Sequence, residues 1–124
     1  QRGQLDEALR IRRDEQLPVY SKLGDVREYA VTMGKIADIL YQRGQLDEAL
    51  RIRRDEQLPI FSKLGDVRAL LVAQANLAIN LMKRGTQDDL PEAQQLLKLA
   101  LGEAQRLGLP EVATIENLLK RFES

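Results

Sequence analysis

Apolar residues recur at spacings of three and four along most of the chain, and this period predicts amphipathic helices. From position 46 onward one face carries Leu46, Ala49, Leu50, Ile60, Phe61 and Leu64. The preceding segment, residues 26–43, places Ala30, Met33, Ile36, Ala37 and Leu40 on a shared face. Residues 67–84 follow the same scheme with Leu71, Leu77, Ala78, Leu81 and Met82. The pattern therefore predicts an all-α protein.

Glycine and aspartate mark where these helices end and begin. Gly24 and Gly65 suit the left-handed position that closes a helix, and Asp25 and Asp66, which follow them, suit the N-cap of the next helix. Further stops at later glycines and prolines complete the division. About six helices are predicted, over residues 1–23, 26–43, 46–64, 67–84, 91–107 and 110–123.

Two prolines, Pro18 and Pro59, fall inside otherwise helical patterns. An internal proline removes one backbone hydrogen bond and costs about 3 kcal/mol. Because the apolar spacing keeps its helical phase beyond each proline, we expect one long kinked helix in preference to a break.

Helical phase also brings polar side chains close to the apolar face, notably Arg53, Glu56 and Gln57. Arg12, Glu15 and Gln16 hold the same places earlier in the chain. A buried arginine without a partner is strongly unfavourable, so each should meet a carboxylate, either one turn on or on a neighbouring helix. The alternative is that the stems lie along the groove while the charged heads reach water.

The chain contains a long internal repeat. Residues 1–27 return as residues 42–68, 41 positions later, with only two changes: Val19 becomes Ile60 and Tyr20 becomes Phe61. A fixed period of this size indicates a solenoid, in which each repeat buries its apolar face against its neighbours. We divide this single array into a half repeat (1–24), a repeat (25–65), a divergent repeat (66–108) and a capping helix (110–124). Because the sequence opens inside a repeat, we interpret it as part of a longer array.

Composition narrows the chemistry. With no His and no Cys, the chain lacks the usual general base, metal ligand and thiolate nucleophile, so we expect no enzyme activity, cofactor or metal site. Nineteen basic residues balance nineteen acidic ones, and the arginines of DEALRIRRDEQ alternate with acids at ion-pair spacings. This favours a self-neutralised face over a nucleic-acid surface. The acidic pairs Asp47/Glu48 and Asp88/Asp89 suit helix N-termini and a structural role. No apolar run could span a bilayer, and no membrane partner is expected.

The segment RGQLDEAL resembles the tetratricopeptide repeat family. That family pairs small residues on two helices around a turn glycine, and the matching residues are Ala37, Gly44 and Ala49, then Ala78, Gly85 and Ala93. The period of 41 exceeds the usual 34. The chain is therefore similar to the long-repeat class, of about 42 residues with high internal identity. Arrays of the HEAT or armadillo type are the alternative.

The resemblance implies an α-solenoid of antiparallel helix pairs in a right-handed superhelix, whose concave groove binds a peptide or helix. The partner-binding positions that it implies are Val31, Gly34, Lys35, Asp38, Tyr41, Asn76, Ile79 and Lys83. Asn76 would hydrogen-bond the backbone of an extended ligand, and Lys35 would meet a carboxylate.

The leading hypothesis is thus a non-enzymatic protein–protein interaction scaffold in the cytoplasm of a bacterium. The alternative is a structural spacer or self-assembly module. In that case the open first helix should expose Leu5, Leu9 and Val19 and support end-to-end association.

Overall fold

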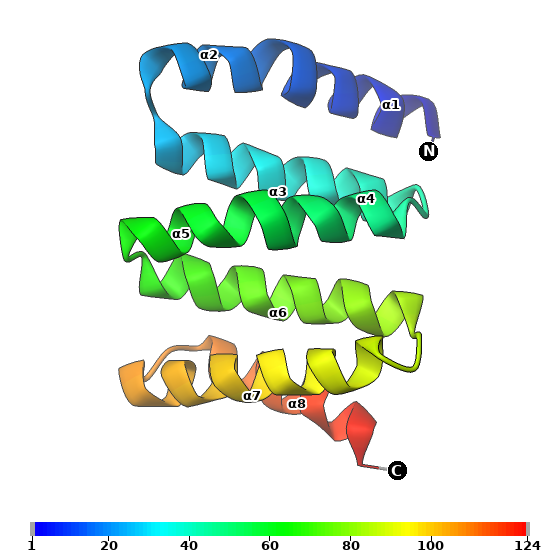
Figure 1. Ribbon diagram of the computed structural model, residues 1–124, viewed down its shortest axis with the longest axis vertical. Coiled ribbons are helices and arrows are strands. Elements are labelled where there is room, and N and C mark those ends of the chain that lie inside the picture. Colours follow the sequence, from blue (N-terminus) through cyan, green and yellow to red (C-terminus); the bar gives the residue numbers. More distant parts are fainter. Residues whose placement is uncertain (1, 124) are drawn as a thin grey trace. The chain divides into compact units, whose positions relative to one another are not determined.

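The computed structural model describes residues 2–123, which form six continuous helices and contain no strand (Figure 1). The expectation of an all-α protein is confirmed. The elements are α1 (Arg2–Arg10), η1 (Ile11–Gln16), α2 (Leu17–Leu23), α3 (Val26–Gln42), α4 (Leu46–Arg51), η2 (Ile52–Gln57), α5 (Leu58–Leu64), α6 (Val67–Arg84), α7 (Asp89–Leu107), α8 (Glu111–Leu119) and η3 (Lys120–Phe122). The segments η1 and η2 are π-helical and η3 is a 3₁₀ turn.

The chain forms two compact units, Gln1–Gly65 and Asp66–Ser124. In the first unit α3 packs against both long helices, α1–η1–α2 and α4–η2–α5. In the second unit α6 packs against α7, and α7 packs against α8. The division between the units falls between residues 65 and 66. Residue 1, where the predicted half repeat begins, and residue 124, where the predicted capping helix ends, lie outside the described residues.

Each long helix passes through its proline without a break, as expected from the apolar phase (Figure 1). The wide π-helical turn ahead of each proline was not predicted from the sequence. The N–H of Leu17 donates to the carbonyl of Arg12, five residues earlier, and the N–H of Leu58 donates to that of Arg53. A wider turn at this point gives the proline ring room against the preceding carbonyls.

The predicted helix ends are confirmed where glycine and aspartate adjoin. Gly24 and Gly65 have φ of 70° and 68°, a left-handed conformation that side chains with a Cβ adopt only with strain. Asp25 Oδ1 and Asp66 Oδ1 each accept a hydrogen bond of 3.1 Å from the backbone N–H three residues on. Each aspartate thus caps the helix that follows it.

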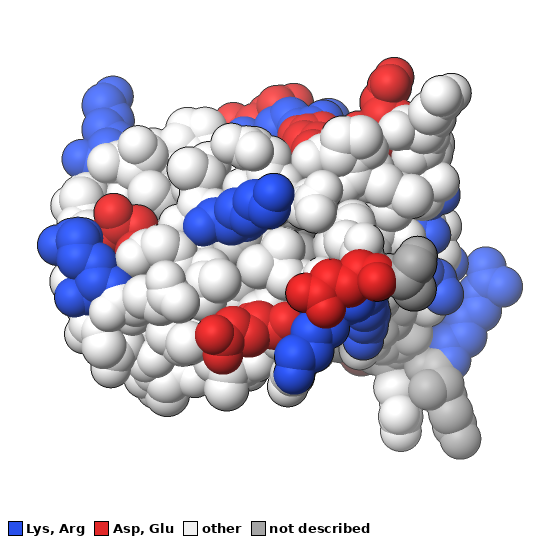
Figure 2. Space-filling view, turned by 90° about the horizontal axis from the view of Figure 1, so that it is seen from below, with Lys and Arg blue, Asp and Glu red and all other residues white. Residues whose placement is uncertain are grey.

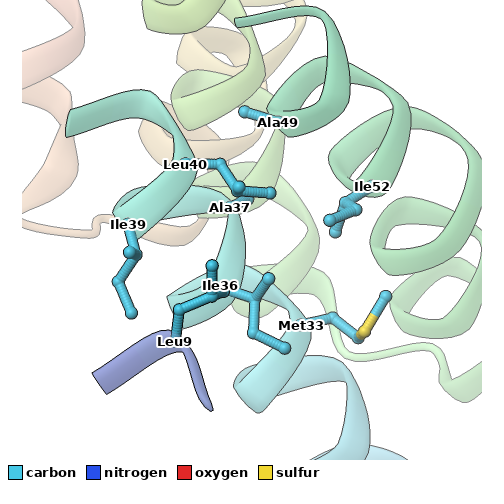
Figure 3. Packing of buried hydrophobic residues seen from close by; sticks show 8 residues of the cluster. All are labelled: Leu9, Met33, Ile36, Ala37, Ile39, Leu40, Ala49 and Ile52. Carbon is cyan, nitrogen blue, oxygen red and sulfur yellow. The ribbon is translucent and has the colours of Figure 1, made fainter. Parts of the chain in front are cut away.

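The core of the first unit lies on both sides of α3. Figure 3 shows the α3 side chains between Leu9 of α1 and the Ala49 and Ile52 side chains of α4 and η2. Ala37 and Ala49 are fully buried, so the small residues of the family pattern lie where α3 and α4 pack together. In the second unit the buried apolar side chains are Leu71, Ala73, Leu77, Ala78, Leu81, Ala93, Leu97, Ala100, Ala104, Ile115 and Leu118.

The expected exposure of the first helix is wrong for Leu9, which is only 6% exposed. Leu9 belongs to the side of α1 that faces α3, where it joins the apolar cluster, and Leu5 is partly buried against the same cluster. Val19 alone of the three is largely exposed, at 52%.

Helix α7 begins at Asp89, two residues before the predicted start at Pro91. The N–H of Asp89 donates to Thr86 Oγ1 and the N–H of Thr86 donates back to Asp89 Oδ2, both at 3.2 Å. Arg84 also donates to both carboxylate oxygens of Asp89, at 2.7 Å each. Proline is tolerated within the first turn because the N–H groups there have no acceptor inside the helix.

Replacing Asp89 by asparagine should lower the free energy of unfolding by about 1–2 kcal/mol at neutral pH, since the buried carboxylate that accepts from Arg84 and from the Thr86 N–H is lost. The hydrogen bonds from Arg84, and then those from Thr86, hold the pKa of Asp89 well below its ordinary value of 3.8. The contribution is therefore complete above about pH 4 and is lost as the pH falls toward the lower folded-state pKa.

Urea unfolding of the wild type and Asp89→Asn between pH 7 and pH 3 measures this difference. Asp88→Asn is the control, because the exposed Asp88 side chain makes no capping hydrogen bond. Equal losses for the two variants, or a difference that does not shrink below pH 4, would contradict the assignment.

Candidate functional site

Between residues 30 and 40, helix α3 is buried at every position except three, which form an accessible stripe. Lys35 and Asp38 are exposed and Val31 is partly exposed, whereas the residues between them are buried. Gln42, at the end of the helix, is also exposed. These positions are separated by four, three and four residues and so lie on one side of the helix. Three of the five predicted α3 residues therefore share an accessible surface with Gln42. We call the surface of Val31, Lys35, Asp38 and Gln42 the α3 stripe.

The other two predicted α3 residues lie off this stripe. Gly34 is buried, and a Cβ built on it would lie 2.2 Å from Gln57 Nε2. Gln57 instead uses the space that glycine leaves and donates to the carbonyl of Ala30 at 3.2 Å. Tyr41 is partly buried against the apolar cluster. Gly34 therefore serves the contact between α3 and η2.

Asp38 has a second role beneath the stripe, because it forms an ion pair with Arg53 of η2. Arg53 is 2% exposed, whereas the Asp38 side chain is 60% exposed. The expectation that Arg53 meets a carboxylate on a neighbouring helix is confirmed. The same expectation is wrong for Arg12, which within residues 2–123 bonds the amide of Gln16 and no carboxylate.

Helix α6 of the second unit leaves a stripe accessible in the same register, 41 residues on. Val72, Asn76 and Ile79 are partly exposed and Lys83 is exposed. We call these four residues the α6 stripe. Its chemistry differs from that of the α3 stripe, since an amide replaces Lys35 and an apolar side chain replaces Asp38.

The first unit also contains a cleft of about 600 Å³ that the sequence analysis did not name. Its apolar lining comes from three helices: Leu9, Leu17, Tyr29, Met33, Ile36, Leu40 and Ile52. Its polar lining is Arg13, Arg43, Gln45, Glu48, Arg51 and Glu56. The periodicity marks most of the apolar residues as core, and only the packing of the two long helices on α3 shows that they border a cleft.

Charges along the cleft are largely paired. Arg51 donates to Glu48 at 2.7 Å and to Glu56 at 2.8 Å, and the first copy forms the same network from Arg10, Glu7 and Glu15. The hydrogen bonds from Arg51 hold the pKa of Glu48 below its ordinary value. The interleaved charges therefore neutralise one another, as their spacing predicts.

Arg13 differs from these residues. Across residues 2–123 it makes no hydrogen bond or ion pair, although its charge contributes a smaller part of the lowering of the Glu48 pKa. The cleft thus combines an apolar floor with one cation that is available to an anionic group. On the face seen in Figure 2, by contrast, basic and acidic side chains are interspersed and no contiguous basic patch is visible.

Residues 2–123 contain no group of three or more His, Cys, Asp or Glu side chains that could hold a metal ion. No helix within the same range has the length and apolar character needed to cross a membrane. No protein-family model, no curated protein and no solved structure matches the chain.

Proposed function

We propose that the chain is a non-enzymatic, tetratricopeptide-like interaction scaffold in which the α3 stripe and the α6 stripe each bind a peptide or helix. The solenoid of antiparallel pairs with a right-handed superhelix, which the family resemblance implies, is part of this proposal. The observation that carries it is the stripe itself. In both helices the residues of this register stay at least partly exposed, with different chemistry, and in α3 all the other positions from 30 to 40 are buried.

The internal repeat supports a division of labour between helices. The segment that forms both long helices differs at two of 27 positions between its copies. Beyond it, residues 69–85 match residues 28–44 at only 5 of 17 positions. Among the differences are Lys35 against Asn76 and Asp38 against Ile79, all on the stripes. We infer that packing restricts the long helices and that ligand preference resides in α3 and α6.

The stripes favour a ligand with both polar and apolar groups. Lys35 is exposed and attracts a carboxylate. The Asn76 side chain is an amide, a type of group that can pair with both the carbonyl and the N–H of an extended peptide backbone. Ile79 provides an apolar contact beside it, one helical turn away.

Selection from a random-peptide display library against the whole chain tests this proposal. Lys35→Ala should weaken peptides bound at the α3 stripe about tenfold, the equivalent of about 1.4 kcal/mol, without changing the melting temperature. Asn76→Ala should do the same for peptides bound at the α6 stripe. Lys22→Ala is the control, since Lys22 is exposed on α2 and belongs to neither stripe. A library that yields no binder, or binders unaffected by both variants, would contradict the proposal.

A structural or self-assembly role is the second candidate, and exposed apolar residues favour it. Val19, Leu23 and Val26, around the α2–α3 turn, are all about half exposed or more. Self-association through them should give a sedimentation mass that rises with concentration and falls back in Leu23→Ser. A monomer at all concentrations would exclude this role.

A further inference from the structure

Two segments of identical sequence, RIRRDEQ at residues 10–16 and 51–57, have different surroundings. In the second copy Ile52, Arg53 and Gln57 are buried. In the first copy the equivalent residues Ile11, Arg12 and Gln16 are only partly buried. Since the local sequence and the π-helical turn are the same, the difference arises from the helices that pack around each copy.

Helix α3 covers the second copy through a simple pattern. Asp38 pairs with Arg53, the carbonyl of Ala30 accepts from Gln57, and Gly34 leaves room for the Gln57 amide. Residues 30, 34 and 38 are spaced by four and so lie along one side of α3. A residue larger than glycine at the middle position would displace the amide, because a Cβ there would lie 2.2 Å from Nε2.

The same side chains of the first copy bond each other. Arg12 Nη1 donates to Gln16 Oε1 at 2.9 Å. The helix that contains them packs against α3 on its other side, through Leu9 and its neighbours. We call the surface of Ile11, Arg12 and Gln16 the η1 face.

We propose that the η1 face binds a helix of another polypeptide that carries glycine and aspartate four residues apart, as α3 does. The incoming aspartate would supply Arg12 with the carboxylate that it lacks within residues 2–123. The glycine would let the Gln16 amide reach a main-chain carbonyl. Ile11 would lose water on contact, as Ile52 does in the second copy.

A second copy of this chain does not fit this description. The α3 side with Gly34 and Asp38 is already covered by η2 of its own chain. No other helix within residues 2–123 carries glycine with aspartate four residues on. The inference is also independent of the proposed function, because the η1 face shares no residue with the α3 or α6 stripe.

A labelled synthetic peptide of residues 26–42, capped at both ends, provides the probe. Titration with the whole chain should give saturable binding and a gain of helical circular dichroism. Arg12→Ala and Gln16→Ala in the chain should each weaken binding about tenfold. Gly34→Leu and Asp38→Asn in the peptide should do the same. Arg10→Ala is the matched control and should leave affinity unchanged, since Arg10 pairs with Glu7 and Glu15 on the exposed side.

Charge reversal separates a direct contact from a general loss of structure. Arg12→Asp should abolish binding of the natural peptide, and the peptide with Asp38→Arg should restore it. Absence of saturable binding, or binding that ignores Arg12 and Gln16, would overturn the proposal. A peptide that displaces α3 from its own chain would contact Gln57 in place of Gln16. Binding that is sensitive to Gln57→Ala alone would therefore also overturn the proposal. An Arg12-dependent dimer of the chain without peptide would show that the occupant is a second copy.

Discussion

Ile52→Ala should lower the free energy of unfolding by about 2–4 kcal/mol, whereas Ile11→Ala should lower it by about 1 kcal/mol. Ile52 is 3% exposed and packs in the α3 cluster, so its truncation leaves a cavity among side chains that relax only in part. Ile11 is partly exposed, and water fills much of the space that its truncation opens. Both sites share the flanking sequence RIRRDEQ, so helix propensity cancels from the comparison.

Urea unfolding followed by far-ultraviolet circular dichroism measures both losses. Ile52→Val and Ile11→Val extend the comparison with a smaller truncation, for which the loss at position 52 should be about 1 kcal/mol. If the two alanine variants lost equal stability, the burial difference between the two copies would have no energetic weight. The basis for an unoccupied η1 face would then be lost as well.

Asp38→Ala should cost about 2–3 kcal/mol, more than Arg53→Met, which should cost about 1 kcal/mol or less. Removing Asp38 takes away a carboxylate from a buried guanidinium. Replacing Arg53 by methionine removes the buried charge while keeping a side chain of similar length. The loss of stability expected for Asp38→Ala is smaller than that for breaking a fully buried ion pair, because the Asp38 carboxylate is largely hydrated.

Thermal and urea unfolding of the two single variants and of the double variant form a cycle that isolates the pairwise term. The loss in Asp38→Ala should also shrink at high salt, since the exposed carboxylate is screened. A larger loss for Arg53→Met than for Asp38→Ala would show that the ion pair stabilises more than its desolvation opposes. That result would reverse the expected order.

The double role of Asp38 matters for the functional proposal. Its side chain belongs to the α3 stripe and also holds Arg53 against the core. A substitution at Asp38 therefore changes stability and ligand contact together. Lys35 and Asn76 are the better tests of binding.

Local features of the fold were predictable because adjacent residues determine them. Gly24 and Asp25 combine a left-handed conformation with a capping oxygen, and both act over one helical turn. The start of α7 was not predicted, since Asp89 is held by Arg84, five residues earlier, across the turn. Proline at position 91 suggested a later start because proline is favoured at the first position of a helix.

The candidate sites likewise include residues that could be predicted from the sequence and features that could not. The family resemblance named Lys35, Asp38 and Gly34 alike as partner-binding positions, and Lys35 and Asp38 do lie off the apolar side of α3. It did not separate Gly34 from them, since the burial of Gly34 depends on the length and position of Gln57 on another helix. The cleft was missed for the same reason, as its walls come from three helices.

The repeated segment RIRRDEQ shows which features the local sequence determines and which depend on tertiary packing. The sequence by itself determines that both copies are helical, because the same side chains and the same following proline act on the same backbone. Only the tertiary structure decides that Arg53 pairs with Asp38 while Arg12 bonds Gln16. The period of a helix specifies which side faces a neighbour. The identity of that neighbour, and so the burial and the bonds of each side chain, depends on which helix packs there.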